Sequence, residues 1–309
     1  MCMIARTASG LTRCAVRTTI RRPNRGHRAS NIREARPALR HLTARGSLAA
    51  PAGARSSADR TAGTQMKPLT NRTLTPELMD EPEASRDDLA VSLRFIRFVN
   101  RRLGGTSSAI RAIERWARLK GDDWPHDRPI RVLDIGTGSA DIPVAMAKWA
   151  KRHHRAIEID AVDLHPTTLN LAREYVGKHE NIHLRQLDAL KLMDHYEPGS
   201  FDVVHAGMFL HHLPDLEVMT VLRIMQRLAQ HGMIWNDLAR RTLARIGVRA
   251  MVALTPGLPR MARHDAVVSV EAGFTRREAV VLAQRVGWEE IQYRDVLWHR
   301  FVLTGVNPE

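Results

Sequence analysis

The sequence predicts an α/β protein with a doubly wound, mostly parallel seven-stranded sheet. Three observations lead to this fold class. From residue 129 onward short apolar runs alternate with longer amphipathic stretches, a glycine-containing turn follows the first run, and the last two runs are very close together. The alternation is typical of parallel strands with helices on both faces. The last pair leaves no room for a crossover helix, which predicts an antiparallel edge strand.

Each expected element follows from the spacing of its apolar residues. Two helices, at 87–102 and 107–119, precede the sheet, and the first stops at Gly104-Gly105. Residues 238–262 form an Arg-rich amphipathic stretch, which we interpret as a helical cap beside the site or as a surface crossover helix. The expected strands are 131–135, 157–162, 182–187, 203–206, 232–236, 290–294 and 297–303, with helices near 140–152, 166–176, 215–229 and 275–286.

The distribution of charge divides the chain into parts. Residues 1–65 hold 13 arginines, no lysine and only two acidic residues, Glu34 and Asp59. Few of their side chains are large and apolar, so we expect a disordered leader. Three explanations stay open: an organelle transit peptide, a nucleic-acid-binding arm, or upstream sequence read from a wrong start, with Met66 as the true start. Residues 66–128 would be an N-terminal helical segment and 129–309 the main domain, with the cap at about 238–265.

Composition limits the class of protein. The other 244 residues carry 34 basic and 31 acidic residues, a balance that attracts polyanions weakly. Both cysteines, Cys2 and Cys14, lie in the leader, which fits a reducing cytoplasm. No apolar run is long enough to span a membrane. The adjacent pairs His153-His154 and His211-His212 lack the spacing of metal ligands, so no metal site is expected.

The turn after the first strand, DIGTGSAD at residues 134–141, has the form of a nucleotide-cofactor turn. Its glycines let the backbone approach a ligand, and the following helix offers unpaired N–H groups. A dinucleotide turn requires a small residue at the position of Asp141, whose charge would repel a pyrophosphate. A cationic cofactor without phosphate would instead tolerate Asp134 and Asp141. S-adenosylmethionine, with its sulfonium and ammonium groups, has that charge pattern.

Acidic residues also follow the next two strands. Asp163 ends the second strand, where a carboxylate can accept hydrogen bonds from two ribose hydroxyls. Asp188 follows the third strand, where its carboxylate and the N–H of Ala189 could bind the edge of an adenine ring. The fourth strand, within FDVVHAGMFLHHL, ends at the position expected for the methionine part. Four strand ends therefore converge on one ligand.

At this point the chain resembles the class I S-adenosylmethionine-dependent methyltransferases, which have a Rossmann-like fold. The resemblance spans about residues 75–305 and is greatest to ubiquinone and menaquinone C-methyltransferases and natural-product O-methyltransferases. It is carried by VLDIGTGSADIP, AVDLHP, LDAL, FDVVHAGMFLHHLPD, WNDLARR and FTRREAVVLAQRVGW. Ala140 replaces the usual third glycine. The resemblance implies that Asp134, Gly136, Thr137 and Gly138 line the methionine end, Asp163 and Leu164 the ribose, and Asp188 and Ala189 the adenine.

The candidate catalytic residues are His211, His212 and Asp237. The two histidines follow the fourth strand, and a positioned imidazole that removes the acceptor's proton can accelerate transfer by about 10²–10⁴. Asn236 and Asp237 end the fifth strand, where they could bind an acceptor hydroxyl or cap a helix. His264 and Asp265 form a weaker candidate pair, and His205 is expected to be a core residue.

The sequence favours a small, largely apolar acceptor such as a phenol, quinone or polyketide. Phe209, Leu210, Trp235 and the cap would supply apolar contacts, and the turn after the fourth strand lacks the Asn/Asp-Pro-Pro-aromatic pattern of base methylation. No nucleic-acid partner is expected, and the oligomeric state stays open. Two alternatives stay open as well: an RNA methyltransferase that uses the Arg-rich arm, and a cofactor-binding protein without catalysis.

Overall fold

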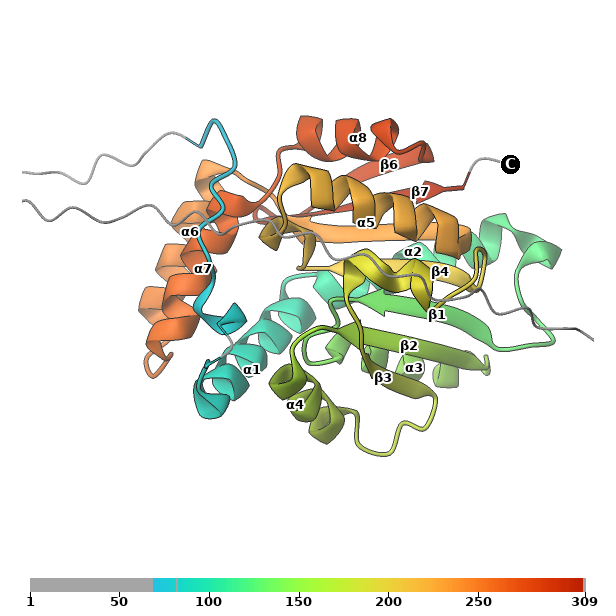
Figure 1. The fold of residues 1–309 in the computed structure, drawn as a ribbon, viewed down its shortest axis with the longest axis horizontal. Helices are drawn as coiled ribbons and strands as arrows, with labels where there is room; N and C mark the ends of the chain where they lie inside the picture. The colour runs from blue at the N-terminus through green and yellow to red at the C-terminus, as the bar shows by residue number, and fades with distance from the viewer. Residues whose placement is uncertain (1–68, 82, 308–309) are drawn as a thin grey trace, which may run out of the picture. The chain divides into compact units, whose positions relative to one another are not determined.

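The computed structural model describes residues 69–81 and 83–307. The expectations for residues 1–65 and for a start at Met66 fall outside this range. Within it, a single sheet is covered by helices on both faces (Figure 1). None of the helices described is both long enough and apolar enough to cross a bilayer.

The sheet has the seven strands that the sequence predicts. Their bounds are β1 Ile130–Ile135, β2 Ile157–Asp163, β3 Ile182–Gln186, β4 Phe201–Gly207, β5 Ala229–Leu238, β6 Glu289–Val296 and β7 Arg300–Val306. The strand order is β3-β2-β1-β4-β5-β7-β6. Strands β1 to β5 pair in parallel, so the carboxyl ends of β1, β2, β3 and β4 meet at one end of the sheet. This arrangement places the expected cofactor residues together.

The last two strands confirm the antiparallel pairing expected at this edge of the sheet. β7 runs antiparallel to both β5 and β6. The antiparallel strand is therefore β7, one position in from the edge, and β6 is outermost. The connection between the two spans only residues 297–299, too short for a crossover.

Eight α-helices flank the sheet within the described residues. The helices expected from apolar periodicity are confirmed, with small shifts at their ends. Their bounds are α1 Arg86–Arg102, α2 Gly105–Leu119, α3 Asp141–Arg152, α4 Pro166–Val176, α5 Asp215–Leu228, α6 Thr242–Leu254, α7 Arg260–Ala272 and α8 Arg276–Arg285. Short 3₁₀ turns lie before and between them: η1 Leu78–Asp80, η2 Gly121–Asp123, η3 Ala189–Asp194 and η4 Leu210–His212.

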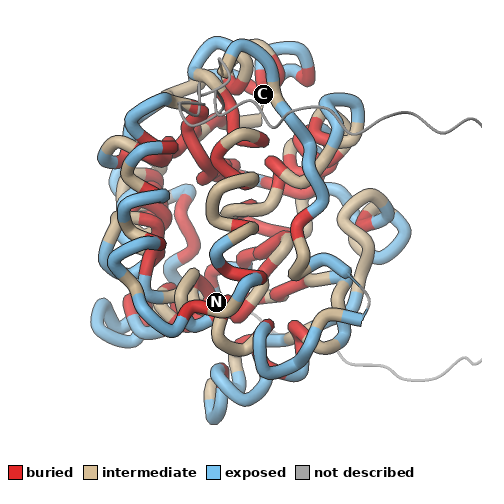
Figure 2. Tube along the Cα trace, turned by 90° about the vertical axis from the view of Figure 1, so that its left-hand side faces the viewer, coloured by how far each residue is buried: buried red, intermediate tan, exposed pale blue. Residues whose placement is uncertain are grey.

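Two cores lie on opposite faces of the sheet, because successive strand residues point to opposite sides. Val132 and Ile234 belong to the core with α2 and α3, whereas Leu133 and Met233 belong to the core with α5 and α8. The central strands are buried on both faces, as their nearly continuous apolar sequences predict. Figure 2 shows buried chain inside the molecule and exposed residues along the outer surfaces.

The expected cap is present as two helices, α6 and α7, which pack on each other and extend to Ala272 (Figure 1). They share a small apolar cluster that includes Val248, Val252 and Val270. Helix α7 also contacts α1 and η1. The stretch is therefore a cap joined to the N-terminal helices and not a surface crossover helix.

Candidate active site

One cavity of about 800 Å³ opens at the carboxyl ends of β1 to β4. All eight expected cofactor residues line it: Asp134, Gly136, Thr137, Gly138, Asp163, Leu164, Asp188 and Ala189. His211 and His212 line the same cavity. Asp237 lies behind His211, with no exposed surface. The structure thus brings the predicted site residues to one place, although they come from separate segments of the chain.

The turn after β1 is shaped by hydrogen bonds and by left-handed backbone. Asp134 is 2% exposed, and its carboxylate accepts hydrogen bonds from Thr137 Oγ1 at 2.6 Å and from His205 Nδ1 at 2.5 Å. Gly136 has φ +66°, and a Cβ there would lie 2.5 Å from the ring of Phe209. Ala140 also has a positive φ of 56°, which explains why glycine suits that position.

The Asp163 carboxylate accepts hydrogen bonds from two backbone N–H groups, one of them in the turn after β1. Its Oδ2 accepts from Gly138 N at 2.9 Å and its Oδ1 from His165 N at 3.0 Å. Burial raises the pKa of Asp163, although these hydrogen bonds oppose the rise. Each carboxylate oxygen can accept a further hydrogen bond, so the carboxylate could still receive hydroxyl donors from a ligand.

Asp188 begins the 3₁₀ turn η3 after β3. Its Oδ1 accepts from Leu190 N at 2.9 Å, and the ammonium of Lys191 lies 3.5 Å from Oδ2. The side chain is partly exposed and lines the cavity next to Ala189. Both proposed adenine-binding residues are therefore accessible to a ligand from the cavity.

His211 forms a buried pair with Asp237. Its Nδ1 lies 2.6 Å from Asp237 Oδ1, and both side chains are at most 2% exposed. The Asp237 carboxylate also accepts from Leu238 N at 2.8 Å and from Trp235 Nε1 at 3.1 Å. Burial by itself lowers the pKa of His211, but the charges and hydrogen bonds of Asp237 and Glu77 raise it to about 10. The imidazole is therefore held as a cation at neutral pH when no ligand is bound.

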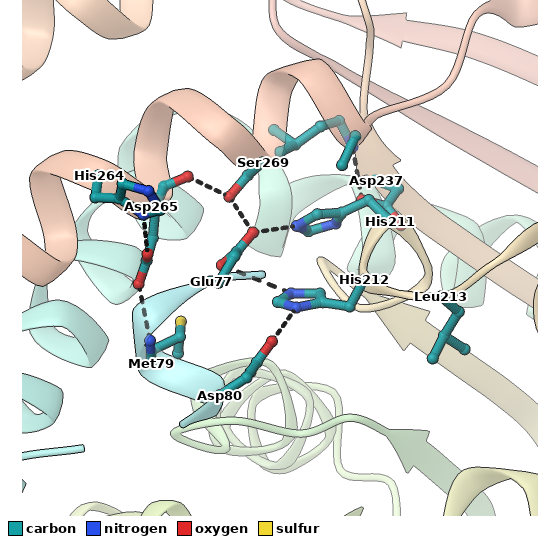
Figure 3. A network of polar contacts seen from close by, with 12 residues as sticks. Glu77, Met79, Asp80, His211, His212, Leu213, Asp237, His264, Asp265 and Ser269 are labelled. Carbon is teal, nitrogen blue, oxygen red and sulfur yellow. Dashed lines mark hydrogen bonds and ion pairs between the residues drawn. The ribbon is translucent and has the colours of Figure 1, made fainter. Parts of the chain in front are cut away.

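His212 stacks beside His211 and pairs with another carboxylate. The ring centroids are 4.3 Å apart, and His212 Nδ1 lies 2.6 Å from Asp80 Oδ2. Burial opposes protonation of His212, but the charge of Glu77 raises its pKa. The close-up in Figure 3 shows both imidazoles directed toward Glu77.

Glu77 is a site residue that the sequence reasoning missed. It is 6% exposed and lies 3.4 Å from His211 Nε2 and 3.9 Å from His212 Nε2. Ser269 Oγ donates to its carboxylate at 2.5 Å. Burial raises the pKa of Glu77, but the charge of His212 and its hydrogen bonds outweigh this and lower it to about 2. No motif marks Glu77, because it belongs to a short turn 134 residues before His211.

Tertiary contacts hold the segment around Glu77 against the cap. Asp265 of α7 accepts from the backbone N–H groups of Leu78 at 2.8 Å and Met79 at 3.1 Å. The Arg72 guanidinium donates to the backbone oxygens of His211 at 3.1 Å and Leu213 at 3.0 Å. The expected pair of His264 and Asp265 exists, at 3.0 Å, but Asp265 serves mainly to hold this segment.

The structure corrects several roles near the site. Asn236 does not face the cavity or cap a helix: its side chain donates to Gly105 O at 3.0 Å and to Ser108 Oγ at 2.9 Å. Leu210 and Trp235, expected to contact the acceptor, are fully buried in the core. Trp235 is buried because β5 is covered on both faces, and Leu210, in η4, packs into the same core.

Three other histidines, His165, His205 and His299, also line the cavity. His205 is a buried strand residue, as expected, and is hydrogen-bonded to Asp134. His299, which the sequence reasoning did not single out, is 2% exposed, and neither ring nitrogen has a hydrogen-bond partner among the described residues. Burial and the charge of Arg300 lower the pKa of His299 to about 4. His299 is therefore a neutral imidazole at pH 7.

Comparison with known proteins agrees with this geometry. Residues 132–232 match a family described as a methyltransferase domain. The chain is 26% identical over 216 residues to a highly reducing polyketide synthase of Gibberella zeae, covering 56% of this chain and 8% of that protein. It is 32% identical over 101 residues to demethylmenaquinone methyltransferase of Deinococcus radiodurans, covering 32% of this chain and 39% of that protein.

A solved structure is similar at lower identity. The magnesium protoporphyrin IX methyltransferase of Synechocystis, with bound SAH, aligns over 68% of this chain and 88% of its own, at 16% identity and a TM-score of 0.44. The chain spans less than half the length of the curated relatives it matches. The match over 132–232, which includes the turn after β1 and the ends of β2, β3 and β4, identifies this part of the chain as a methyltransferase domain.

Proposed function

We propose that this protein transfers the methyl group of S-adenosylmethionine to a small, largely apolar acceptor, such as a phenol, a quinone or a polyketide. One observation carries the proposal. A single cavity is lined both by the polar strand ends of β1 to β4 and by apolar side chains of α1, α6 and α7. The apolar part includes Leu93, Phe95, Ile96, Val99, Val248, Met251 and Ala262, together with Met208 and Phe209 after β4.

The polar end of the cavity fits the cofactor. In this proposal Asp163 accepts hydrogen bonds from the ribose hydroxyls, beside Leu164. Asp188 and the N–H of Ala189 bind the adenine, and the turn from Asp134 to Gly138 lies along the methionine part. The bound cofactor supplies a methyl group on a cationic sulfur, which an in-line attack by the acceptor removes. The residues contribute mainly by aligning the two ligands, an effect that can amount to roughly 7–11 kcal/mol.

The two histidines indicate which kind of acceptor the site would hold. His211, held by Asp237, and His212, held by Asp80, line the cavity with their imidazoles beside the Glu77 carboxylate. An acceptor with hydroxyl or carbonyl oxygens, which can accept hydrogen bonds from protonated imidazoles, suits this site. We therefore favour a phenol or a carbon acid next to carbonyl groups. The names of the two relatives, a polyketide synthase and a demethylmenaquinone methyltransferase, support the same class of small acceptor.

Two substitutions separate the roles of the cofactor and acceptor residues. Asp163→Ala is expected to weaken binding of S-adenosylhomocysteine at least tenfold by titration calorimetry, because the ribose hydroxyls lose their acceptor. Asp194→Ala, an exposed carboxylate nearby, is the matched control and should bind normally. His212→Ala should reduce turnover on a panel of phenols and β-dicarbonyl compounds while leaving cofactor affinity unchanged. Equal losses of cofactor affinity in the Asp163 and His212 variants would contradict the assigned roles.

The remaining parts of the proposal concern partners and location. We propose a cytoplasmic enzyme with no nucleic-acid partner. Deleting residues 1–65 should leave activity on small acceptors unchanged, whereas loss of RNA binding together with activity would favour the RNA methyltransferase. Cofactor binding without turnover on every acceptor would favour the non-catalytic alternative.

A further inference from the structure

The two adjacent histidines and Glu77 form a cluster in which three electron-pair donors face one another (Figure 3). One ligand atom from each residue lies within 4.8 Å of the others, and all three residues line the cavity. We propose that Glu77, His211 and His212 bind a divalent transition-metal ion, such as Zn²⁺, through one carboxylate oxygen and the two Nε2 atoms. The sequence analysis expected no metal site, because the adjacent histidines alone lack the spacing of metal ligands and Glu77 lies far from them along the chain.

The hydrogen bonds of the two imidazoles determine which nitrogen is available. Nδ1 of His211 lies 2.6 Å from Asp237 and Nδ1 of His212 lies 2.6 Å from Asp80, so each Nδ1 carries a proton and donates it. In the neutral imidazole the lone pair is then on Nε2. Both Nε2 atoms face the negatively charged carboxylate of Glu77. A divalent ion between the three residues could replace the proton that His211 carries when no ion is bound.

The distances fit ligands of one ion better than hydrogen bonds. His211 Nε2 lies 3.4 Å and His212 Nε2 lies 3.9 Å from the nearest Glu77 oxygens. Usual N–H···O distances are about 2.7–3.2 Å. Ligand atoms about 2.0–2.2 Å from a tetrahedral ion lie roughly 3.3–3.6 Å apart. The first separation falls in that range, and the second is measured to the other carboxylate oxygen of Glu77, so one oxygen faces each imidazole.

The surroundings have the second layer of contacts that metal ligands usually have. Each histidine donates its other ring proton to a carboxylate, which orients the ring and makes Nε2 a better ligand. Ser269 Oγ donates to Glu77 at 2.5 Å and fixes that carboxylate in the same way. Glu77, Asp80 and Asp237 together carry a formal charge of −3, so a divalent ion would neutralise most of it. The arrangement could therefore bind a cation without any change of fold.

The ligand types select the class of ion. Two imidazoles and one carboxylate suit Zn²⁺, Fe²⁺ or Co²⁺, whereas Mg²⁺ prefers oxygen ligands. Three protein ligands leave a further position for water or an acceptor oxygen, since all three residues line the cavity. This site deepens the proposed function by naming what would hold the acceptor oxygen. Metal binding itself does not require methyl transfer, so the two proposals fail separately.

The test is a Zn²⁺ titration of the full chain, produced without a histidine tag, in competition with a chromophoric chelator. We expect each chain to bind one Zn²⁺ ion tightly. Glu77→Gln and His212→Gln should each weaken this binding at least 100-fold, and Asp80→Asn should weaken it about 10–100-fold through the second layer. Asp80 has a half-exposed side chain, so its replacement does not threaten folding. Co²⁺ substitution should give visible ligand-field absorption that the Glu77 variant lacks.

A matched control and a folding check make the result decisive. The exposed neighbouring pair, changed together as His153→Gln and His154→Asn, should bind Zn²⁺ like the wild type. S-adenosylhomocysteine binding by each variant reports an intact fold independently of the ion. Absence of a tight equivalent, or an equivalent unaffected by the Glu77, His212 and Asp80 variants, overturns the metal site. If methyl transfer then persists in a chelator, the proposed function stands and protons occupy the two Nε2 atoms.

Discussion

Replacing Asp237 with asparagine tests the buried pair that orients His211. The carboxylate receives three donors: His211 Nδ1 and Leu238 N at Oδ1, and Trp235 Nε1 at Oδ2. An asparagine can keep the first two through its oxygen, but its NH₂ group would then face the indole N–H. An orphaned buried donor costs about 1–3 kcal/mol. With the lost charge pairing of His211, the total should be about 3–5 kcal/mol.

The assay is urea unfolding in buffer with a chelator, so that no divalent ion contributes. For a folded unit of this size the loss corresponds to a melting temperature lower by roughly 6–20 °C. Asp295→Asn, which removes an exposed ion pair with Arg241, is the control and should cost about 0–1 kcal/mol. A cost below about 1 kcal/mol for Asp237→Asn at pH 6 would refute the reasoning, because the pair would then not be maintained in solution.

The same variant carries a pH signature. The pKa of His211 is raised from 6.5 to about 10, so its protonation stabilises the folded state fully below about pH 6.5. That contribution is lost as the pH rises through about 10. The difference in unfolding free energy between wild type and Asp237→Asn should therefore be largest near pH 6 and shrink toward pH 10. A difference that stays constant over this interval would show that His211 is neutral throughout.

The remaining predictions concern the turn after β1 and the acid stability of the cavity. Gly136→Ala should destabilise the fold by more than the roughly 1–2 kcal/mol of left-handed backbone, because its Cβ would overlap the ring of Phe209. Gly199 has φ +68° and no neighbour within 4 Å of an added Cβ, so Gly199→Ala measures the backbone cost alone. Equal losses of unfolding free energy in the two variants would contradict the overlap with Phe209. His299 has its pKa lowered to about 4, so the unfolded chain binds its proton first and stability falls from pH 6.5 toward 4. His299→Phe should flatten this acid limb in urea titrations by up to about 1.4 kcal/mol per pH unit, and an unchanged slope would contradict the pKa.

The half of the cavity that we propose for the cofactor could be predicted from the sequence, because its residues follow directly after predicted strands. Asp134, Asp163 and Asp188 each follow an apolar run, and parallel strands bring their carboxyl ends to one end of the sheet. The identity and order of these residues therefore predict their proximity. The hydrophobic pattern likewise predicts every strand and the helices around them, since alternation of short and long apolar periods depends only on neighbouring residues.

The other half of the site depended on contacts that no periodicity encodes. Glu77 reaches His211 because Asp265 and Arg72 anchor its short segment between the cap and the turn after β4. Trp235 is buried in the core and does not line the cavity, because β5 is covered on both faces. The sequence of one strand does not reveal this coverage.

The sequence alone determined the element order, the cofactor turn and the acidic residues at the strand ends, because these follow from spacing along the chain. Tertiary structure decided which carboxylates accompany the histidines, what charge the imidazoles carry and which apolar residues line the cavity. The physical reason is that burial and charge act through space, between groups that the fold brings together from distant parts of the chain.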